Sequence, residues 1–376
     1  MSVFSKFDVS YIEKIRSEGF TSQQIGSQIS VWDADFFVHH KTPGLLLITF
    51  CEEGEEDSTS AIRQALYALY GNWSGGLTLA DAGHFIGHPE ELPATLLEMR
   101  RWGFIPVLLT PYQSSTYHAY ASFCMSEETV NLLSVDESPD LGEMTELIGE
   151  KNWLTHLISH TPNFLFNYSL LAYQQYLSNP EALKILENFH FDLIRLGEVR
   201  DKIKLTEPFF RNAELVSFDL GAVRTSDTGI LEFSNPNGLY AEEACRLMRY
   251  AGHGGKLKCI VLCGFSGLGL NTISAALLAQ LIWHLNDGYE ARIDDGQIGK
   301  ESDFFTYTIG GTNEVEELVF YKSARSGRWW MKVPSFAKQH GRSNRHHIVP
   351  CNYEDYQQAL SGELPETWWR THQKLA

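Results

Sequence analysis

The sequence predicts an α/β fold in which a central, mainly parallel sheet lies between two layers of helices. Short apolar runs alternate along the chain with stretches whose apolar residues recur at helical spacing. Several of the runs consist almost wholly of Val, Ile and Leu, which is typical of strands buried on both faces. Strands that alternate with helices in this way indicate a parallel sheet, because each helix returns the chain to the start of the next strand.

The expected strands are short apolar runs. In chain order they are Leu45–Phe50, Leu77–Ala80, Ile105–Leu109, Val130–Val135, Leu193–Leu196, Leu215–Phe218 and Lys258–Cys263. The expected helices carry apolar residues three or four positions apart, as Ile62, Leu66 and Leu69 do in the first of them. They are Ser58–Tyr70, Glu90–Trp102, Ser169–Leu177, Pro180–Asn188, Tyr240–Ala251 and Thr272–Leu285.

The C-terminal part of the chain has a different pattern. Two β segments, Phe304–Ile309 and Leu318–Tyr321, are followed by a tryptophan-rich segment and by a polar helix with a Trp-Trp pair. Large aromatic side chains need a surface against which to bury. We therefore expect residues 301–376 to form a C-terminal β/aromatic appendage that packs on a main domain of residues 1–300, with Asn286–Lys300 as a charged link.

Charge and composition exclude two classes of partner. The 376 residues include 30 Lys and Arg against 47 Asp and Glu, a net charge of −17 at pH 7. We expect no nonspecific binding to nucleic acid and none to an anionic membrane surface, because both need a basic protein surface. No apolar run approaches the ~20 residues that span a bilayer, and the N-terminus lacks a signal-peptide pattern. The six cysteines form no CxxC pair, which indicates reduced thiols. We therefore expect a cytoplasmic protein.

Carboxylates follow two of the expected strands at the point where each strand ends. Asp136 and Asp140 come after Val130–Val135, and Asp219 comes after Leu215–Phe218. Ligands of an open parallel sheet bind outside the carboxyl ends of its strands, so these three aspartates are expected to converge on one edge. Like charges this close repel unless a cation neutralises them, and carboxylate oxygens suit Mg²⁺ or Mn²⁺. The alternative is that each aspartate caps a turn or helix.

The region around Asp219 resembles a known family. Ser217–Arg224, followed by Ser226-Asp227, is similar to the third metal motif of the ureohydrolase superfamily of arginase, agmatinase and formimidoylglutamase. Asn235–Ala244 resembles the stretch that follows this motif. The likeness continues into the tail at Phe320–Ser323, Arg328–Met331 and His346–Cys351. It covers nearly the whole chain, is closest to formimidoylglutamase-like proteins of the Bacteroidetes type, and implies a three-layer α/β/α arginase-like fold.

The resemblance also implies an activity and a set of metal ligands. The family hydrolyses guanidino or amidino C–N bonds with two bridged Mn²⁺ ions, which lower the pKa of a shared water. Six side chains hold the two ions. Aspartates are retained at three of these positions, Asp136, Asp140 and Asp219. The other three carry substitutions: Gln113 and Ser138 stand where the family has histidines, and Gly221 where it has an aspartate.

These substitutions argue against a binuclear centre, because a serine hydroxyl is a poor ligand and glycine offers no side chain. We therefore expect no bound cofactor. The alternative is one weakly bound Mn²⁺ or Mg²⁺ on the three aspartates, with a carbonyl oxygen from Gln113. Cys263 stands where the family has a glutamate that contacts the substrate. Arg224, in the family stretch after the third motif, is a candidate for gripping a ligand carboxylate, with a structural ion pair as its alternative.

Other conspicuous residues are expected to have structural roles. Adjacent histidines of a strand point to opposite faces, so neither His346-His347 nor His39-His40 is expected to hold one ion. Gly264–Asn271 matches neither GxGxxG nor the P-loop and indicates a tight turn. Cys259 and Cys263 suit a buried pair. The same strand ends and helix starts also carry Arg195, Arg200 and Arg211, further candidates for a carboxylate grip or an ion pair.

Three functional hypotheses follow. The first is a catalytically inactive homologue that binds a small nitrogenous ligand or a partner. The second is a C–N hydrolase acting on formimidoylglutamate, or on another amidino or guanidino compound, with a single metal on Asp136, Asp140 and Asp219. The third is a metal-free enzyme with Cys263 as its nucleophile. Because the family commonly forms oligomers, the resemblance also implies a homo-oligomer.

Overall fold

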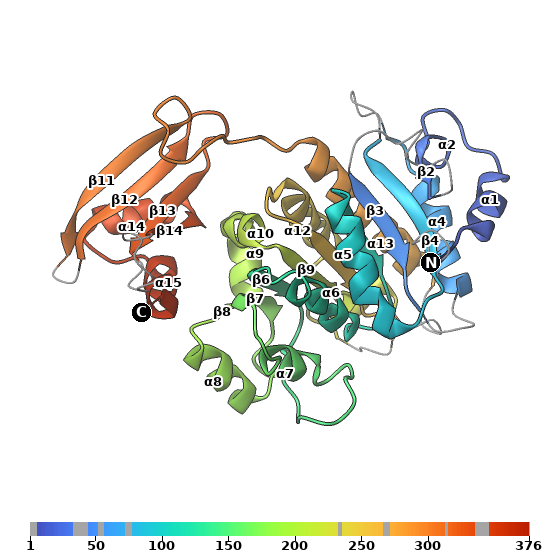
Figure 1. Cartoon of the computed structure of the whole chain (residues 1–376), viewed down its shortest axis with the longest axis horizontal. Coiled ribbons are helices and arrows are strands. Elements are labelled where there is room, and N and C mark those ends of the chain that lie inside the picture. Colours follow the sequence, from blue (N-terminus) through green and yellow to red (C-terminus); the bar gives the residue numbers. More distant parts are fainter. Residues whose placement is uncertain are drawn as a thin grey trace.

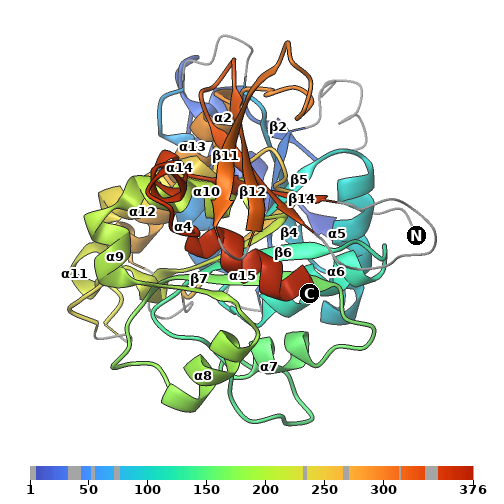
Figure 2. The same cartoon turned by 90° about the vertical axis from the view of Figure 1, so that its left-hand side faces the viewer.

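The computed structural model describes residues 6–32, 44–51, 56–71, 77–231, 235–265, 271–312, 315–334 and 346–375. These residues form two parts, which Figure 1 shows side by side. The first part, the body, contains the described residues up to Glu290. The second part, the C-terminal unit, contains those from Phe304 onward, and residues 291–303 connect the two. Figure 2 shows the C-terminal unit in front of the body.

The body is built around a ten-stranded sheet. Its strands are β1 (Phe7–Asp8), β2 (Ser30–Val31), β3 (Leu45–Thr49), β4 (Leu79–Phe85), β5 (Ile105–Leu109), β6 (Val130–Val135), β7 (Leu165–Tyr173), β8 (Asp192–Arg195), β9 (Leu215–Asp219) and β10 (Cys259–Cys263). Their order is β1-β4-β3-β5-β10-β9-β6-β7-β8, and β2 also pairs with β4. The pairs are parallel except for β1 with β4. The strands β5, β10, β9 and β6 therefore end side by side at one edge.

Helices cover both faces of this sheet, and each face has its own apolar core. The core on one face includes residues of α4 (Glu56–Tyr67), α12 (Ala241–His253) and α13 (Thr272–Glu290). The core on the other face includes residues of α5 (Leu92–Arg101), α6 (Ser115–Cys124) and α7 (Trp153–Ile158). Strand β3 serves both cores, because Leu45 and Leu47 point to the first and Leu46 and Ile48 to the second. The predicted three-layer α/β/α fold with a mainly parallel sheet is thus confirmed.

The body has six further helices. They are α1 (Ser10–Arg16), α2 (Ile25–Gln28), α8 (Pro180–Asn188), α9 (Leu196–Asp201), α10 (Glu207–Asn212) and α11 (Thr225–Thr228). Across the described residues, no helix combines the length and the apolar character needed to cross a membrane.

Two of the predicted elements are wrong, for physical reasons. The chain at Ser169–Leu177 is predicted to be helical, but it is strand up to Tyr173, within β7. Its apolar residues fit a buried strand as well as a helix, and pairing with β6 and β8 decides the outcome. The strand predicted at Leu77–Ala80 begins at Leu79 and continues to Phe85. The sequence pattern hides this extension because the strand contains Asp81, a charged residue that the fold buries.

The C-terminal unit has a sheet and a core of its own. Its antiparallel strands are β11 (Phe304–Thr312), β12 (Val315–Ser323), β13 (Trp329–Pro334) and β14 (His346–Cys351), and its helices are α14 (Tyr353–Leu360) and α15 (Glu366–Leu375). Phe320, Met331 and Trp368 are buried in one cluster between this sheet and its helices. The tryptophans of the tail therefore bury against elements of the tail as well as against the body.

A buried ion pair joins the sheet to its helical cover. Arg63 of α4 and Asp81 of β4 are fully buried, and both oxygens of the carboxylate accept hydrogen bonds of 2.8 Å from the guanidinium. Tyr67 donates a further bond of 2.8 Å to Asp81. Arg63 also donates to Thr49 of β3 and to the Gly83 carbonyl. One side chain thus ties α4 to two strands.

We expect Arg63→Ala to lower the free energy of unfolding by about 3–5 kcal/mol, because it leaves the Asp81 carboxylate buried without its partner. Urea denaturation of the purified protein measures the effect. The matched control is Arg249→Ala, which breaks an ion pair of 2.6 Å with Asp287 whose side chains are 43% and 30% exposed. It should cost less than about 1 kcal/mol. Equal losses for the two variants would contradict this account of Arg63.

Candidate functional site

The carboxyl edge of the sheet brings together the three aspartates that the sequence singles out. Asp136 directly follows β6, and Asp219 is the last residue of β9, which pairs with β6 in parallel. Asp140 lies four residues beyond Asp136. All three are buried, with exposed fractions of 5–8%. Cys263, the last residue of β10, is the direct neighbour of Asp219 in the sheet.

Each of these carboxylates accepts a hydrogen bond from the chain itself. Gln113 follows β5, and its Nε2 donates to Oδ2 of Asp136 at 2.5 Å. The backbone N–H of Gly221 donates to Oδ1 of Asp219 at 2.5 Å. The indole Nε1 of Trp153 donates to Oδ2 of Asp140 at 3.1 Å. The amide nitrogen of Gln113, rather than an oxygen, therefore faces the aspartates.

Two glutamates that the sequence analysis does not single out add to the negative charge. Asn235 donates to Glu137 at 2.6 Å. Glu150 accepts a bond of 2.6 Å from the Gln113 backbone N–H and one of 3.2 Å from that of Ser114. Glu137 lies inside the 136–140 segment that sequence reasoning had reached. Glu150 lies in the loop before α7, where no pattern indicates its position.

Burial raises the pKa of the three aspartates. It raises the pKa of Asp140 to about 7, an effect that Lys151 partly offsets and Asp219 increases. It also raises the pKa of Asp219 to about 6, against the opposing Gly221 N–H bond. The pKa of Asp136 lies well above its ordinary value because of burial and the charges of Asp140 and Asp219. The five acids, with Lys151 Nζ 3.9 Å from Asp140, form what we call the acidic edge.

The residues of the acidic edge do not fit a binuclear manganese centre. Gly221 has no side chain to offer, and a Cβ placed there would lie 2.8 Å from Oδ1 of Asp219. Gly264 approaches the same carboxylate so closely that a Cβ on it would lie 2.2 Å from Oδ1. Within the described residues, no three or more His, Cys, Asp or Glu side chains are arranged to hold a metal ion. Ser138 contributes its backbone N–H, at 3.3 Å from Oδ1 of Asp136.

Cys263 is poorly suited to act as a nucleophile. Its side chain is fully buried, and its thiol donates to the Phe218 carbonyl at 3.5 Å. Burial, together with the charges of Asp219 and Asp136, raises its pKa well above the ordinary value. A thiolate is the reactive form of cysteine, and this environment disfavours it. Burial likewise raises the pKa of Cys259 to about 12.

A cavity of about 880 Å³ opens beside the acidic edge, at the carboxyl ends of β3, β4 and β5. Glu150 belongs to both, because it lines the cavity and holds the Gln113 backbone. Asp8, His84 and His118 also line the cavity. Burial lowers the pKa of His118, which favours its neutral form at pH 7. The cavity lies within the size range of small-molecule sites, about 300–1,000 Å³.

The predicted arginines make local contacts. Arg224 lies 2.7 Å from Asp227 and stacks on the ring of Tyr240. Arg200 pairs with Glu243 at 3.5 Å, and its guanidinium also stacks on the ring of Tyr240. Arg195 donates to the Tyr173 hydroxyl at 3.2 Å. These contacts agree with the ion-pair alternative for Arg224.

The remaining sequence candidates are only partly described. His347 packs on the ring of Phe166, with ring centroids 4.9 Å apart, and burial lowers its pKa. His39-His40 and residues 266–270 of the Gly264–Asn271 segment lie outside the described residues. Asn271, at the end of that segment, caps α13 by accepting bonds from the backbone N–H groups of Ile273 and Ser274.

Comparison with known proteins identifies the fold. No protein-family model and no curated protein matches the sequence. Among solved structures, the chain is similar to Trypanosoma cruzi formiminoglutamase with Mn²⁺, with a TM-score of 0.63 and 17% identity over 72% of this chain and 99% of that one. It is similar to Bacillus subtilis formimidoylglutamase, with a TM-score of 0.63 and 15% identity over 73% and 95%. It is also similar to agmatine ureohydrolase of Thermoplasma volcanium, with a TM-score of 0.54 and 16% identity over 74% and 97%.

The arginase-like fold expected from the sequence motifs is therefore confirmed. At identities of 15–17%, the likeness is one of fold. Since the alignments span 72–74% of this chain and 95–99% of the three relatives, about a quarter of this chain has no counterpart in them.

We expect Asp140→Asn to change the pH dependence of stability in chelated buffer. The folded chain binds the Asp140 proton more tightly than the unfolded chain does, with a pKa of about 7 against 3.8. The free energy of unfolding should therefore fall as pH rises from about 4 to about 7. Asparagine does not titrate, so the variant should be more stable than the wild type at pH 8, by up to about 4 kcal/mol. At pH 4, near the pKa of the unfolded chain, the difference should nearly vanish.

Urea denaturation at pH 4 and pH 8 measures this difference. The matched control is the exposed Asp201→Asn, whose stability should follow the wild type at both pH values. The same pH slope in Asp140→Asn and in the wild type would show that burial of Asp140 does not strain the fold.

Proposed function

We propose that this chain is a ureohydrolase-fold protein without ureohydrolase activity, and that its acidic edge and the adjoining cavity bind a small cationic nitrogen compound. The observation that supports the first part most directly is the hydrogen bonding of the three aspartates. Gln113, Gly221 and Trp153 donate to oxygens of the three carboxylates. A binuclear centre would need those carboxylates, and three further side chains, to face two cations.

The binding part of the proposal rests on charge and space. Five acids share the acidic edge and, among the described residues, one ammonium group forms an ion pair with them, that of Lys151, which is 88% exposed and 3.9 Å from Asp140. The cavity beside them is lined by Glu150, which is one of the five, and by one further carboxylate suited to N–H donors, that of Asp8. An amine or amidine cation would supply N–H donors and positive charge together, and charge-assisted bonds of this kind are about twice as strong as neutral ones.

We expect no stoichiometric manganese in this protein. Elemental analysis of protein purified without chelator, and again after Mn²⁺ loading and desalting, measures the metal content. Assays with formimidoylglutamate, arginine and agmatine under Mn²⁺ should show no turnover. Two metal equivalents per chain, or turnover abolished by Asp136→Ala, would overturn the proposal of lost activity.

We expect a small amine or amidine to bind with a Kd that depends on Glu150. Isothermal titration calorimetry with agmatine, putrescine and formamidine is the measurement. Glu150→Gln should weaken the binding at least tenfold, because it removes one carboxylate from the cavity. The control Glu181→Gln removes the same charge from an exposed position on α8 and should change the Kd less than twofold. If none of the three cations binds, the proposed ligand class is wrong.

The second candidate function is a C–N hydrolase with one metal. The convergence of Asp136, Asp140 and Asp219 within one buried edge favours it. One equivalent of Mn²⁺ that is lost in Asp140→Asn, together with turnover of formimidoylglutamate, would support this candidate over the first. The oligomeric state implied by the family belongs to the same proposal and is measured by light scattering during gel filtration.

A further inference from the structure

A second cavity, of about 470 Å³, lies where the body meets the C-terminal unit. It lies at the opposite end of the strands from the acidic edge. Lys256, which lines the cavity, comes just before β10 begins, whereas the residues of the acidic edge come where the strands end. Four positively charged side chains line it, and they come from three parts of the chain. Arg211 and Lys256 belong to the body, Arg292 to the connection, and Arg328 to the C-terminal unit. We call this site the junction cavity.

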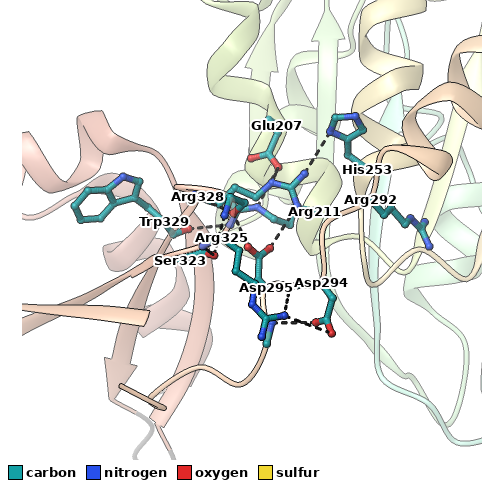
Figure 3. Close-up of polar contacts among 12 residues, drawn as sticks. Glu207, Arg211, His253, Arg292, Asp294, Asp295, Ser323, Arg325, Arg328 and Trp329 are labelled. Atoms are coloured by element: carbon teal, nitrogen blue, oxygen red, sulfur yellow. Dashed lines mark hydrogen bonds and ion pairs between the residues drawn. The ribbon is translucent and has the colours of Figure 1, made fainter. Parts of the chain in front are cut away.

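The cations of the junction cavity outnumber their acidic partners. Arg211 and Arg328 share one carboxylate, that of Glu207, at 3.1 and 3.5 Å. Arg328 also pairs with Asp295 at 3.5 Å. Figure 3 shows these two arginines between the two acids. The second aspartate of the connection, Asp294, also lines the cavity and lies 4.0 Å from Arg325. Arg325 pairs as well with Asp303, at 3.2 Å, and Lys300 lies 4.0 Å from Asp303, so these two cations balance these two acids.

Two of the four cations have neutral partners. Lys256 donates to the side-chain oxygen of Asn212 at 2.8 Å, and Arg292 donates to the Gly252 carbonyl at 2.6 Å. Among the described residues, neither forms an ion pair with a carboxylate within 4.0 Å. Four cations against Glu207 and Asp295 leave a surplus of two positive charges, in a chain whose net charge is −17. Burial and the charge of Arg328 contribute to lowering the pKa of Arg292 to about 10.

Two donors at the junction cavity are buried without a hydrogen-bond partner in the described part of the chain. They are Nη2 of Arg292 and Nε2 of His253. Arg328 donates to Nδ1 of His253 at 3.3 Å, so the ring proton of a neutral His253 lies on Nε2. Burial first, then Arg249 and Arg328, lower the pKa of His253 to about 4, which keeps the ring neutral at pH 7. A buried donor without an acceptor costs about 1–3 kcal/mol.

We propose that the junction cavity binds the phosphate group of a small phosphorylated molecule. A phosphate monoester carries about −1.5 to −2 charges at pH 7, which matches the surplus of two, whereas a single carboxylate neutralises only one. Guanidinium groups match the geometry of phosphate oxygens, and Arg211, Arg292 and Arg328 bring three of them to the lining of the cavity. The cavity is larger than one phosphate ion needs and falls in the range of small-molecule sites, about 300–1,000 Å³.

The same ligand would link the body to the C-terminal unit. Arg211 of α10 already donates to the carbonyls of Trp329 and Cys351 in that unit, at 3.0 and 3.2 Å. A phosphate held by Arg292, Arg328 and Lys256 would add a contact to all three parts of the chain. Binding should therefore raise the midpoint of thermal unfolding, since it stabilises only the docked arrangement.

Isothermal titration calorimetry of the full chain, at constant ionic strength set by chloride, tests the proposal. The probes are inorganic phosphate, glycerol 3-phosphate and, as a dianion without phosphorus, succinate. We expect one saturable site for the phosphorylated probes. Glycerol 3-phosphate binding more tightly than phosphate would identify an organic phosphate as the ligand, and equal affinities would identify the free ion. Succinate should bind at least tenfold more weakly than either.

Matched variants separate a built site from general attraction. Lys256→Gln and Arg292→Gln should each weaken phosphate binding at least tenfold, which corresponds to about 1.4 kcal/mol. Arg246→Gln removes the same charge from an exposed position on α12 and should change the affinity less than twofold. Lys256 is exposed, so its variant serves if Arg292→Gln fails to fold. Absence of saturable binding in the wild type, or equal weakening by Arg246→Gln and Lys256→Gln, would overturn the proposal.

Discussion

The convergence of like charges at one edge of the parallel sheet is the constraint on which the rest of the site depends. A parallel sheet places the carboxyl ends of neighbouring strands side by side, and here those ends carry Asp136, Asp140 and Asp219 in nearly complete burial. Their repulsion must be compensated. In this chain a glutamine amide, a backbone N–H and an indole N–H provide the compensation, together with raised pKa values. The loops that deliver these donors are therefore as much a part of the site as the acids.

Under the proposed function, the substitutions that the family resemblance implies would have two effects at once. Replacing a metal ligand by Gln113 removes a ligand and also adds a donor that stabilises Asp136. Glycine at position 221 removes a carboxylate and lets the backbone approach Asp219. Each change thus lowers the need for a cation at the acidic edge. In the proposed function, the acidic edge and the cavity beside it would then bind an organic cation rather than activate water.

Charge is distributed unevenly over the molecule, and the C-terminal unit contributes to this. The body concentrates acids at the carboxyl edge of its sheet, whereas the junction cavity gathers arginines and a lysine in a strongly acidic chain. Arg211 joins the two parts, because it forms an ion pair with Glu207 of the body and donates a hydrogen bond to the Trp329 carbonyl of the C-terminal unit. The two sites would bind ligands of opposite charge. The aligned relatives cover about three quarters of this chain.

The sequence by itself determined the α/β class, most strand positions and the meeting of Asp136, Asp140 and Asp219, because strand burial and the rule for parallel edges are local properties of the pattern. It did not determine β7, whose leucines fit helix and strand alike, or the extension of β4 through Asp81, whose burial is compensated by Arg63 and by the Tyr67 hydroxyl. Glu150 at the acidic edge and the cations of the junction cavity come from loops and from segments far apart in the chain. Only the tertiary structure brought them together, since no local periodicity records which distant side chains will share a cavity.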